Sequence, residues 1–189
     1  MGKMTSLLEL ARRGLNTPEL LLEIKQFDTN KLDKWTEFYA KATGRVSIRT
    51  QRDGEVVCPF LPNITIKKAA QQVPSLIRSG YSILCFKAID PKDSIFCGNF
   101  ADTGKKYVVE WIAGPGTCRD LEKARKINHF SIDPTKKISH IQIPQPAGDI
   151  IGMLVPTCRN NELIEWSIYP YKIGQLKDTI IFWEIRPWR

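Results

Sequence analysis

Two acidic residues and one arginine lie in the two most strand-like segments of this 189-residue chain. Residues 163–169 and 179–187 are rich in the β-branched and aromatic side chains that suit a half-buried pleated surface, and turn-forming and charged residues separate them. We expect two antiparallel strands. Because side chains alternate between faces along a strand, their pairing would gather Glu165, Glu184 and Arg186 on one surface.

The same alternation predicts how the last segment is divided between its two faces. Trp183 and Ile185 should share one face, and Phe182 should share the other with Glu184 and Arg186.

Two carboxylates on one rigid surface can hold Mg²⁺, which prefers oxygen ligands and usually bridges to phosphate groups. An arginine beside them would neutralise phosphate oxygens in a forked geometry. The three residues would equally form a cross-strand ladder of ion pairs on a solvated face, and residue types and spacing alone favour this simpler interpretation.

A second basic surface is predicted further upstream. The segment 45–50 alternates polar and apolar residues, so Arg45, Ser47 and Arg49 should line one face of a strand. Four lysines outside this strand are candidates for further phosphate contacts, although a solvated surface position explains each lysine alone better. These are Lys25, Lys87, Lys105 and Lys106.

A glycine-bearing loop could present backbone N–H groups to an anion. Gly114, Gly116 and Thr117 lead into the charged segment 118–126, which has good helix formers and which Thr117 could cap. Free N–H groups at a helix N-terminus readily hold an anion. An ordinary turn followed by a helix explains the same residues.

The composition fits a globular protein with an anionic partner. The hydrophobic content is 42%, the charged content 25% and the formal net charge +8. No apolar run is long enough to span a bilayer, so we expect no membrane association and a cytoplasmic location. Five widely spaced cysteines and two histidines show no metal-binding spacing. The positive charge favours a nucleotide, a nucleic acid or an acidic surface as partner.

One basic region keeps a nucleic-acid-binding function open. Between residues 105 and 140 there are eight Lys and Arg against four Asp and Glu, a net charge of +4. This region carries much of the excess positive charge. The basic residues do not alternate with aromatic residues as a stacking platform for single-stranded nucleic acid would require.

The order of the elements predicts an α+β fold with a dominant antiparallel sheet and a few short helices. We expect one compact domain that is divisible into lobes 1–80 and 81–189. Helices are predicted at 6–14, 28–44 and 65–79, the last kinked or divided at Pro74. Strands are predicted at 19–24, 45–50, 81–87, 94–100, 106–112, 138–143 and 149–155, followed by the closing pair, with a meander over 81–112 and a loop over 51–63.

Several short motifs resemble those of ATP-grasp domains. Residues 11–18 and the apolar strand after them resemble the opening of such domains. The segment 46–50, Val-Ser-Ile-Arg-Thr, resembles a motif in the nucleotide-binding domain of phosphoenolpyruvate synthase and pyruvate phosphate dikinase. Residues 164–166, followed after a hairpin by 181–187, resemble the closing pattern of that family, and their spacing agrees with it.

The resemblance implies roles for individual residues. Arg49 would contact the transferred phosphate, Glu165 would serve the metal, and Glu184 and Arg186 would serve metal and phosphate. The chain departs from the family pattern at Leu163, where an acid is expected although Glu162 is adjacent, and it lacks an opening Gly-Gly-Lys.

The implied function is a minimal ATP- and Mg²⁺-binding module. It would catalyse phosphoryl transfer or acid–amine ligation on an unidentified acceptor. Two other functions stay open: a basic nucleic-acid-binding protein, and a catalytically degenerate ATP-grasp relative that acts as a binding subunit.

Overall fold

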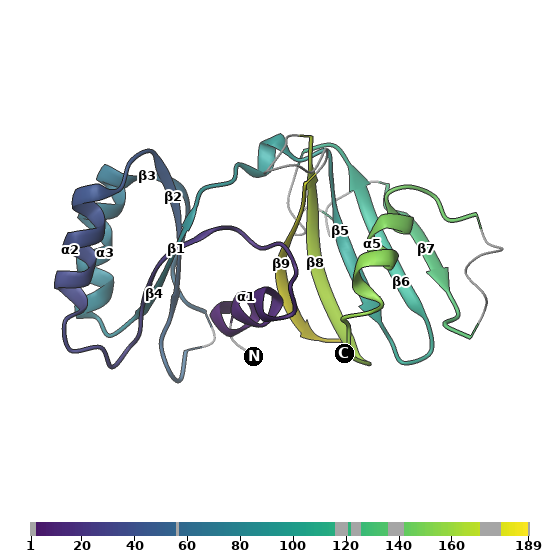
Figure 1. Cartoon of the computed structure of the whole chain (residues 1–189), viewed down its shortest axis with the longest axis horizontal. Helices are drawn as coiled ribbons and strands as arrows, with labels where there is room; N and C mark the ends of the chain where they lie inside the picture. The colour runs from purple at the N-terminus through teal and green to yellow at the C-terminus, as the bar shows by residue number, and fades with distance from the viewer. Residues whose placement is uncertain are drawn as a thin grey trace. The chain divides into compact units, whose positions relative to one another are not determined.

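The structure of the protein is a computed structural model that describes residues 3–55, 57–115, 121, 126–135, 142–170 and 179–188 (Figure 1). The chain divides into two compact units. Unit 1 comprises Met1–Thr5 and Pro18–Asp90, and unit 2 comprises Ser6–Thr17 and Pro91–Arg189. Among the residues described, no helix has the length and apolar character needed to cross a membrane.

Unit 1 is built on a four-stranded sheet in the order β1-β4-β2-β3, in which every pairing is antiparallel. The strands are β1 (Leu20–Ile24), β2 (Arg45–Gln51), β3 (Phe60–Thr65) and β4 (Ser82–Lys87). Helices α2 (Lys31–Lys41) and α3 (Ile66–Arg78) cover one face (Figure 1). Between the helices and the sheet lies a core that includes Trp35, Val46, Ile48, Val73 and Ile83.

The predicted alternation along β2 is confirmed. Val46, Ile48 and Thr50 are buried, whereas Ser47 and Arg49 are only partly buried. Burial of the apolar set against the helices fixes the register of this strand, because a slip of one residue would turn every side chain to the opposite face.

Helix α3 runs through Pro74 without being divided, so of the two predicted outcomes, a kink or a division, the division does not occur. The side chain of Thr65 accepts a hydrogen bond from Lys68 N and caps the helix. Ala69, Val73 and Ile77 bury one face of the helix. Burial of the Val and Ile side chains, about 1.5–3 kcal/mol each, offsets the roughly 3 kcal/mol that an internal proline costs.

Unit 2 is built on a five-stranded antiparallel sheet in the order β7-β6-β5-β8-β9. The strands are β5 (Phe96–Asp102), β6 (Tyr107–Ala113), β7 (Asn128–Ile132), β8 (Glu162–Tyr169) and β9 (Thr179–Pro187). The structure thus confirms the α+β class with antiparallel sheets and short helices, and it confirms the closing pair of strands. A short 3₁₀ turn, η1 (Pro91–Asp93), precedes β5.

The predicted meander over 81–112 is wrong in its first step. β4 pairs with β1 and β2 in unit 1, whereas β5 and β6 pair with each other in unit 2. Turn-forming residues between two strands indicate that the chain changes direction, but they do not indicate which sheet the next strand joins.

Three local assignments also differ from prediction. The segment expected as a strand at 149–155 lies in helix α5 (Ala147–Leu154), whose buried Ala147, Ile150, Ile151 and Leu154 follow helical spacing. β7 was not predicted. The expected loop at 51–63 contains the first residues of β3, whereas the expected helix at 118–126 and strand at 138–143 lie largely outside the described residues.

Helix α1 (Lys3–Arg12) begins three residues before the predicted start at Ser6, which lies inside it. The buried Ser6 Oγ donates to Ile185 O at 2.9 Å and accepts a hydrogen bond from Ile185 N. After Gly14, whose φ of +76° ends the helix as predicted, Asn16 O accepts from Phe182 N at 2.8 Å. These bonds cover the outer edge of β9, a position at which an open strand would otherwise invite further pairing.

Candidate functional site

The register of β8 and β9 brings together the two acids and the arginine predicted from the sequence. Glu165 is directly opposite Glu184, and Leu163 is opposite Arg186. Arg186 Nη2 lies 3.6 Å from Glu165 Oε1. Cross-strand partners have Cβ atoms about 5 Å apart, so the two carboxylates can reach a common ligand.

A β-bulge changes the predicted division of β9 between its faces. The register shifts between Glu165 and Trp166, so that Trp166 pairs with Phe182 and Trp183 is the extra residue. Trp183 Nε1 donates to Ser167 Oγ at 3.0 Å, which places the indole on the face of Glu165. Phe182 is fully buried on the opposite face. The prediction that Phe182 shares a face with Glu184 is therefore wrong, because the extra residue interrupts the alternation.

The acids belong to a line of polar residues that crosses the whole sheet. In consecutive strands, Glu184, Glu165, Asn99, Glu110 and His129 are directly opposite one another. We call these five residues the polar row. At about 4.8 Å between strands, the row is about 19 Å long. Sequence reasoning missed its last three members, because Asn99 and Glu110 each stand among apolar neighbours in their strands and give no alternating polar pattern.

The polar row is more exposed toward its His129 end. The Glu165 side chain is 23% exposed, whereas those of Glu110 and His129 are 42% and 53% exposed. His129 Nδ1 lies 3.5 Å from Glu110 Oε1. Between Glu165 and Glu110 in the row, Asn99 Oδ1 is buried and has no hydrogen-bond partner among the described residues.

The opposite face of this sheet forms the core that holds the row in place. Phe100, Trp166 and Phe182 are fully buried there, and α5 lies across that face (Figure 1). A Cβ atom on Gly98 would meet Glu110 O at 2.2 Å and the Trp166 ring at 2.5 Å. Only glycine therefore fits at this point of β5, next to Asn99 in the row.

Glu162 does not replace the acid that the family pattern places at Leu163. Its carboxylate accepts two hydrogen bonds from Arg13, at 2.7 and 2.8 Å, and one from Arg159 N at 2.8 Å. Burial alone would raise the pKa of Glu162, but these hydrogen bonds outweigh it and the pKa is lowered. Glu162 is thus committed to a structural ion pair, which also raises the pKa of Arg13.

Arg49 lies in unit 1, on the side of β2 away from the helix-covered core. Its guanidinium carbon is 4.9 Å from the centroid of the Phe60 ring, and Phe60 is 46% exposed. The cation–π contact orients the arginine.

The lysines named as phosphate contacts are dispersed. In unit 1, Lys25 follows β1 and Lys87 ends β4; because Ile24 pairs with Ile83, they lie at opposite ends of the sheet. Lys87 Nζ is 3.5 Å from Glu19 Oε2, with both side chains exposed. Lys105 is exposed in the turn between β5 and β6 of unit 2.

The predicted anion-binding loop is not supported at its described residue. Gly114 has a φ of +102°, and its N–H already donates to Ile95 O at 2.8 Å. Gly116 and Thr117 lie outside the described residues. Lys105 and Gly114 are at opposite ends of β6, about 20 Å apart, so one phosphate group cannot contact both.

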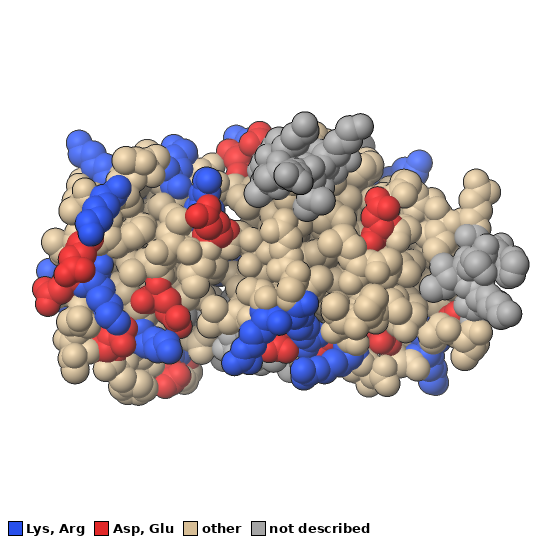
Figure 2. All heavy atoms as spheres, viewed as in Figure 1, with Lys and Arg blue, Asp and Glu red and all other residues tan. Residues whose placement is uncertain are grey.

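Five of the eight Lys and Arg residues in the region 105–140 lie outside the described residues, which include Lys105, Lys106 and Lys126. On the face of the molecule in Figure 2, Lys and Arg are interspersed with Asp and Glu over α2 and α3 of unit 1. The nucleic-acid-binding hypothesis stays a prediction.

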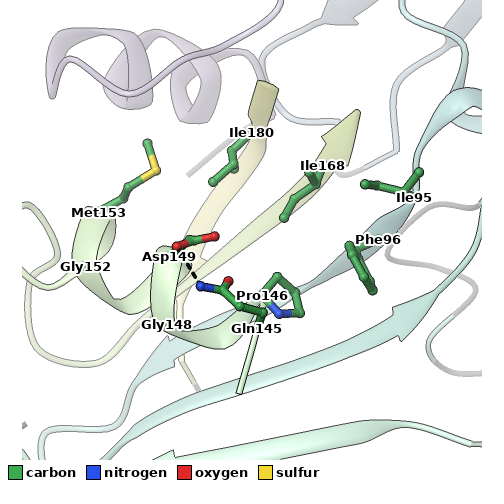
Figure 3. A pocket seen from close by; sticks show the side chains of 10 residues that line it. All are labelled: Ile95, Phe96, Gln145, Pro146, Gly148, Asp149, Gly152, Met153, Ile168 and Ile180. Atoms are coloured by element: carbon green, nitrogen blue, oxygen red, sulfur yellow. Dashed lines mark hydrogen bonds between the residues drawn. The ribbon is translucent and has the colours of Figure 1, made fainter. Parts of the chain in front are cut away.

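A groove of about 660 Å³ lies on the other face of the unit 2 sheet (Figure 3). Ile168 and Ile180 line it from the sheet, and Met153 and Asp149 line it from α5. Asp149 Oδ1 accepts a hydrogen bond from Gln145 Nε2 at 3.1 Å. The groove is mainly apolar and is separate from the polar row.

The residues of the row fit a magnesium–phosphate complex better than an all-protein metal site. Among the residues described, no three His, Cys, Asp or Glu side chains are grouped closely enough to hold a metal ion. Mg²⁺ commonly takes one or two carboxylates and completes its coordination with water and substrate phosphates. Glu165 and Glu184 match that requirement, and the unpartnered Asn99 Oδ1 adds a buried oxygen beside them.

Comparison with known proteins leaves the family open. No family model and no curated protein matches the chain. One similar solved structure is the crystal structure of the macrocyclase MdnC bound with the precursor peptide MdnA from Microcystis aeruginosa MRC. It matches with a TM-score of 0.49 and 14% sequence identity, over 97% of this chain and 51% of the other. This chain therefore spans about half the length of that protein.

Proposed function

We propose that the protein is an ATP- and Mg²⁺-binding module of the ATP-grasp type that catalyses phosphoryl transfer or acid–amine ligation on an unidentified acceptor. The observation that carries the proposal is the pairing of Glu165 with Glu184 on one sheet face, with Arg186 in contact with Glu165. These are the residues to which the motif resemblance assigns metal and phosphate contacts.

Glu165 and Glu184 would hold the metal from two adjacent strands. The bound Mg²⁺ would neutralise phosphate charge. Glu165 and Glu184 are residues of paired strands rather than of a loop. The register of the two strands therefore sets the spacing of their carboxylates. A site on such rigid elements keeps its geometry without reorganisation during the reaction.

Arg186 is suited to exchange its partner for phosphate. Its 3.6 Å contact with Glu165 is longer than the 2.7–2.9 Å of a strong charge-assisted hydrogen bond, and its side chain is 51% exposed. Breaking this contact therefore costs little. When the metal takes over the charge of Glu165, the arginine would be released to bind phosphate oxygens in its forked geometry.

The test is the thermal stability of the protein with ATP, with and without Mg²⁺. A ligand at 100 times its Kd stabilises the folded state by about 2.7 kcal/mol. We expect the midpoint of unfolding to rise with Mg·ATP and to rise less with ATP in EDTA. The Mg-dependent part should be lost in Glu184→Gln, and Arg186→Ala and Arg49→Ala should weaken ATP binding.

The matched control is Glu19→Gln, which neutralises an exposed acid of unit 1 and should leave the response unchanged. No shift in the wild-type protein at millimolar Mg·ATP would sink the proposal.

Leu163 favours a second version, in which the protein binds nucleotide without turnover. Its side chain is 7% exposed, it pairs with Arg186, and it stands where the family pattern has an acid. Release of ADP from Mg·ATP on addition of carboxylic acid and amine acceptors would favour the enzyme. If the wild-type protein binds nucleotide without releasing ADP, and Leu163→Asp does release ADP, the binding subunit is favoured.

A further inference from the structure

The groove beside α5 in unit 2 has an apolar floor built from three adjacent strands (Figure 3). Phe96 on β5 pairs with Ile168 on β8, which in turn pairs with Ile180 on β9, and all three side chains line the groove. Its volume of about 660 Å³ lies in the range of small-molecule sites. Because paired strands hold the floor, a ligand would meet a preformed apolar surface.

The wall that α5 gives to the groove contains two glycines that the packing does not require. Gly148 and Gly152 are one helical turn apart and both line the groove. Among the described residues, a Cβ atom on Gly152 would meet nothing within 4 Å, and one on Gly148 would make only ordinary contacts, the nearest at 3.7 Å. Neither glycine has a φ in the left-handed region. Glycine inside a helix is less stable than alanine, and here the missing side chains keep the wall of the groove open.

Asp149 gives the groove a negative charge. It alone has an ionisable side chain among the described residues that line the groove, and its carboxylate extends from α5 into the space that faces Ile168 (Figure 3). Asp149 Oδ1 accepts a hydrogen bond from Gln145 Nε2 at 3.1 Å, and none of the described Lys, Arg or His side chains forms an ion pair with it. A carboxylate has about four acceptor sites, so Asp149 can accept from further donors.

We infer that the groove binds a small organic ammonium ion, whose apolar body packs on the floor of the groove and whose protonated amine pairs with Asp149. The carboxylate favours a cation, the apolar floor favours a hydrocarbon body, and the volume suits a molecule rather than a single ion. A protonated amine carries three donors, which matches the acceptor capacity of Asp149. The groove lies on the sheet face opposite Glu165 and Glu184, so the inference does not depend on the proposed function.

The probe is n-octylammonium, and n-octanol and n-octanoate are its neutral and anionic counterparts of equal chain length. Binding to the 189-residue chain is followed by backbone amide shifts in ¹H–¹⁵N nuclear magnetic resonance spectra, in which Gly148 and Gly152 report on the groove directly. Asp149→Asn removes the charge and keeps an oxygen that can accept from Gln145. Its matched control is Glu19→Gln, which removes one negative charge from an exposed position in unit 1.

A second pair of variants tests the shape of the groove. Gly152→Leu places a large side chain on its wall, and Gly152→Ala changes the helix propensity with little change in volume. The thermal unfolding midpoint of both variants should equal or exceed that of wild type, because leucine and alanine favour a helix over glycine. A loss of binding in Gly152→Leu therefore cannot be attributed to unfolding.

We expect n-octylammonium to shift the Gly148 and Gly152 signals saturably and to bind about fivefold more tightly than n-octanol, the gain from one partly exposed ion pair. The anionic n-octanoate should bind most weakly. Asp149→Asn should remove the preference for the amine and leave n-octanol binding unchanged. Gly152→Leu should weaken n-octylammonium and n-octanol about tenfold, because its side chain displaces methylene groups that are each worth about fourfold in affinity.

Three outcomes would overturn the inference. Equal binding of the three probes, or an unchanged Kd for n-octylammonium in Asp149→Asn, would exclude an ammonium ion as the preferred ligand. No saturable shift of Gly148 and Gly152 with millimolar n-octylammonium would refute the site. If a peptide with a lysine between apolar residues shifts these signals and n-octylammonium does not, the groove is a protein-docking surface instead. Each outcome leaves the Mg·ATP test of the proposed function unaffected.

Discussion

The ion pair between Arg13 and Glu162 should be a main determinant of the stability of unit 2. The Arg13 side chain is 9% exposed and that of Glu162 is 15% exposed, and two hydrogen bonds of 2.7 and 2.8 Å join them. Removing one partner of a buried pair costs about 3–5 kcal/mol, because the other charge is left without compensation. Since both residues keep some exposure, we expect Arg13→Ala to lower the free energy of unfolding by about 3 kcal/mol.

The pH dependence of this loss can be worked out from the direction of the pKa shift. The folded-state pKa of Glu162 is below its ordinary value, so its contribution to stability is complete above that value and disappears as the pH falls through the folded-state pKa. Glu162→Gln should therefore be less stable than wild type at pH 7. The difference should shrink progressively below about pH 4.5.

The measurement is urea unfolding of wild type and both variants between pH 3 and pH 7, followed by circular dichroism and by tryptophan fluorescence. Arg13→Met combined with Glu162→Leu should recover part of the loss, because removing both charges leaves neither uncompensated. A loss below 1 kcal/mol in Arg13→Ala at pH 7, or a difference between wild type and Glu162→Gln that stays constant with pH, would refute the reasoning.

The remaining predictions concern the edge of β9 and the centre of the polar row. Ser6→Ala should lower the free energy of unfolding by about 1–3 kcal/mol, because the buried N–H and C=O of Ile185 lose their partner; Ser6→Thr, which keeps the hydroxyl, tests whether the hydrogen bonds are responsible. Gly98→Ala should cost about 3 kcal/mol or more, since its Cβ would overlap Glu110 O and the Trp166 ring; an alanine variant as stable as wild type in thermal unfolding would contradict the packing.

The strands that carry the candidate site were predictable because their signal is local. Alternation placed Arg49 on the exposed side of β2, and the β-branched and aromatic content defined the strands of Glu165 and Glu184. The helical spacing of α5 was equally present in the sequence. It was misread because a short apolar segment fits either period.

The bulge at Trp183 was not predictable from β9 alone. A bulge is defined by the pairing of two strands. Here Trp166 pairs with Phe182 and Glu165 pairs with Glu184, which leaves Trp183 as the extra residue. The burial of Phe182 on the core face and the hydrogen bond from Trp183 to Ser167 both depend on it. A property of a strand pair cannot be read from one strand.

The sequence by itself determined the α+β class and the two closing strands, because helices and strands follow from local periods of about 3.6 and two along the chain. It also predicted that Glu165, Glu184 and Arg186 would meet if those two strands paired. Tertiary structure alone decided that Asn99 and Glu110 continue this site across the sheet, since that depends on the strand order β6-β5-β8-β9 and its register. Strand order is set by the burial of side chains that are far apart in the chain, and no local pattern records it.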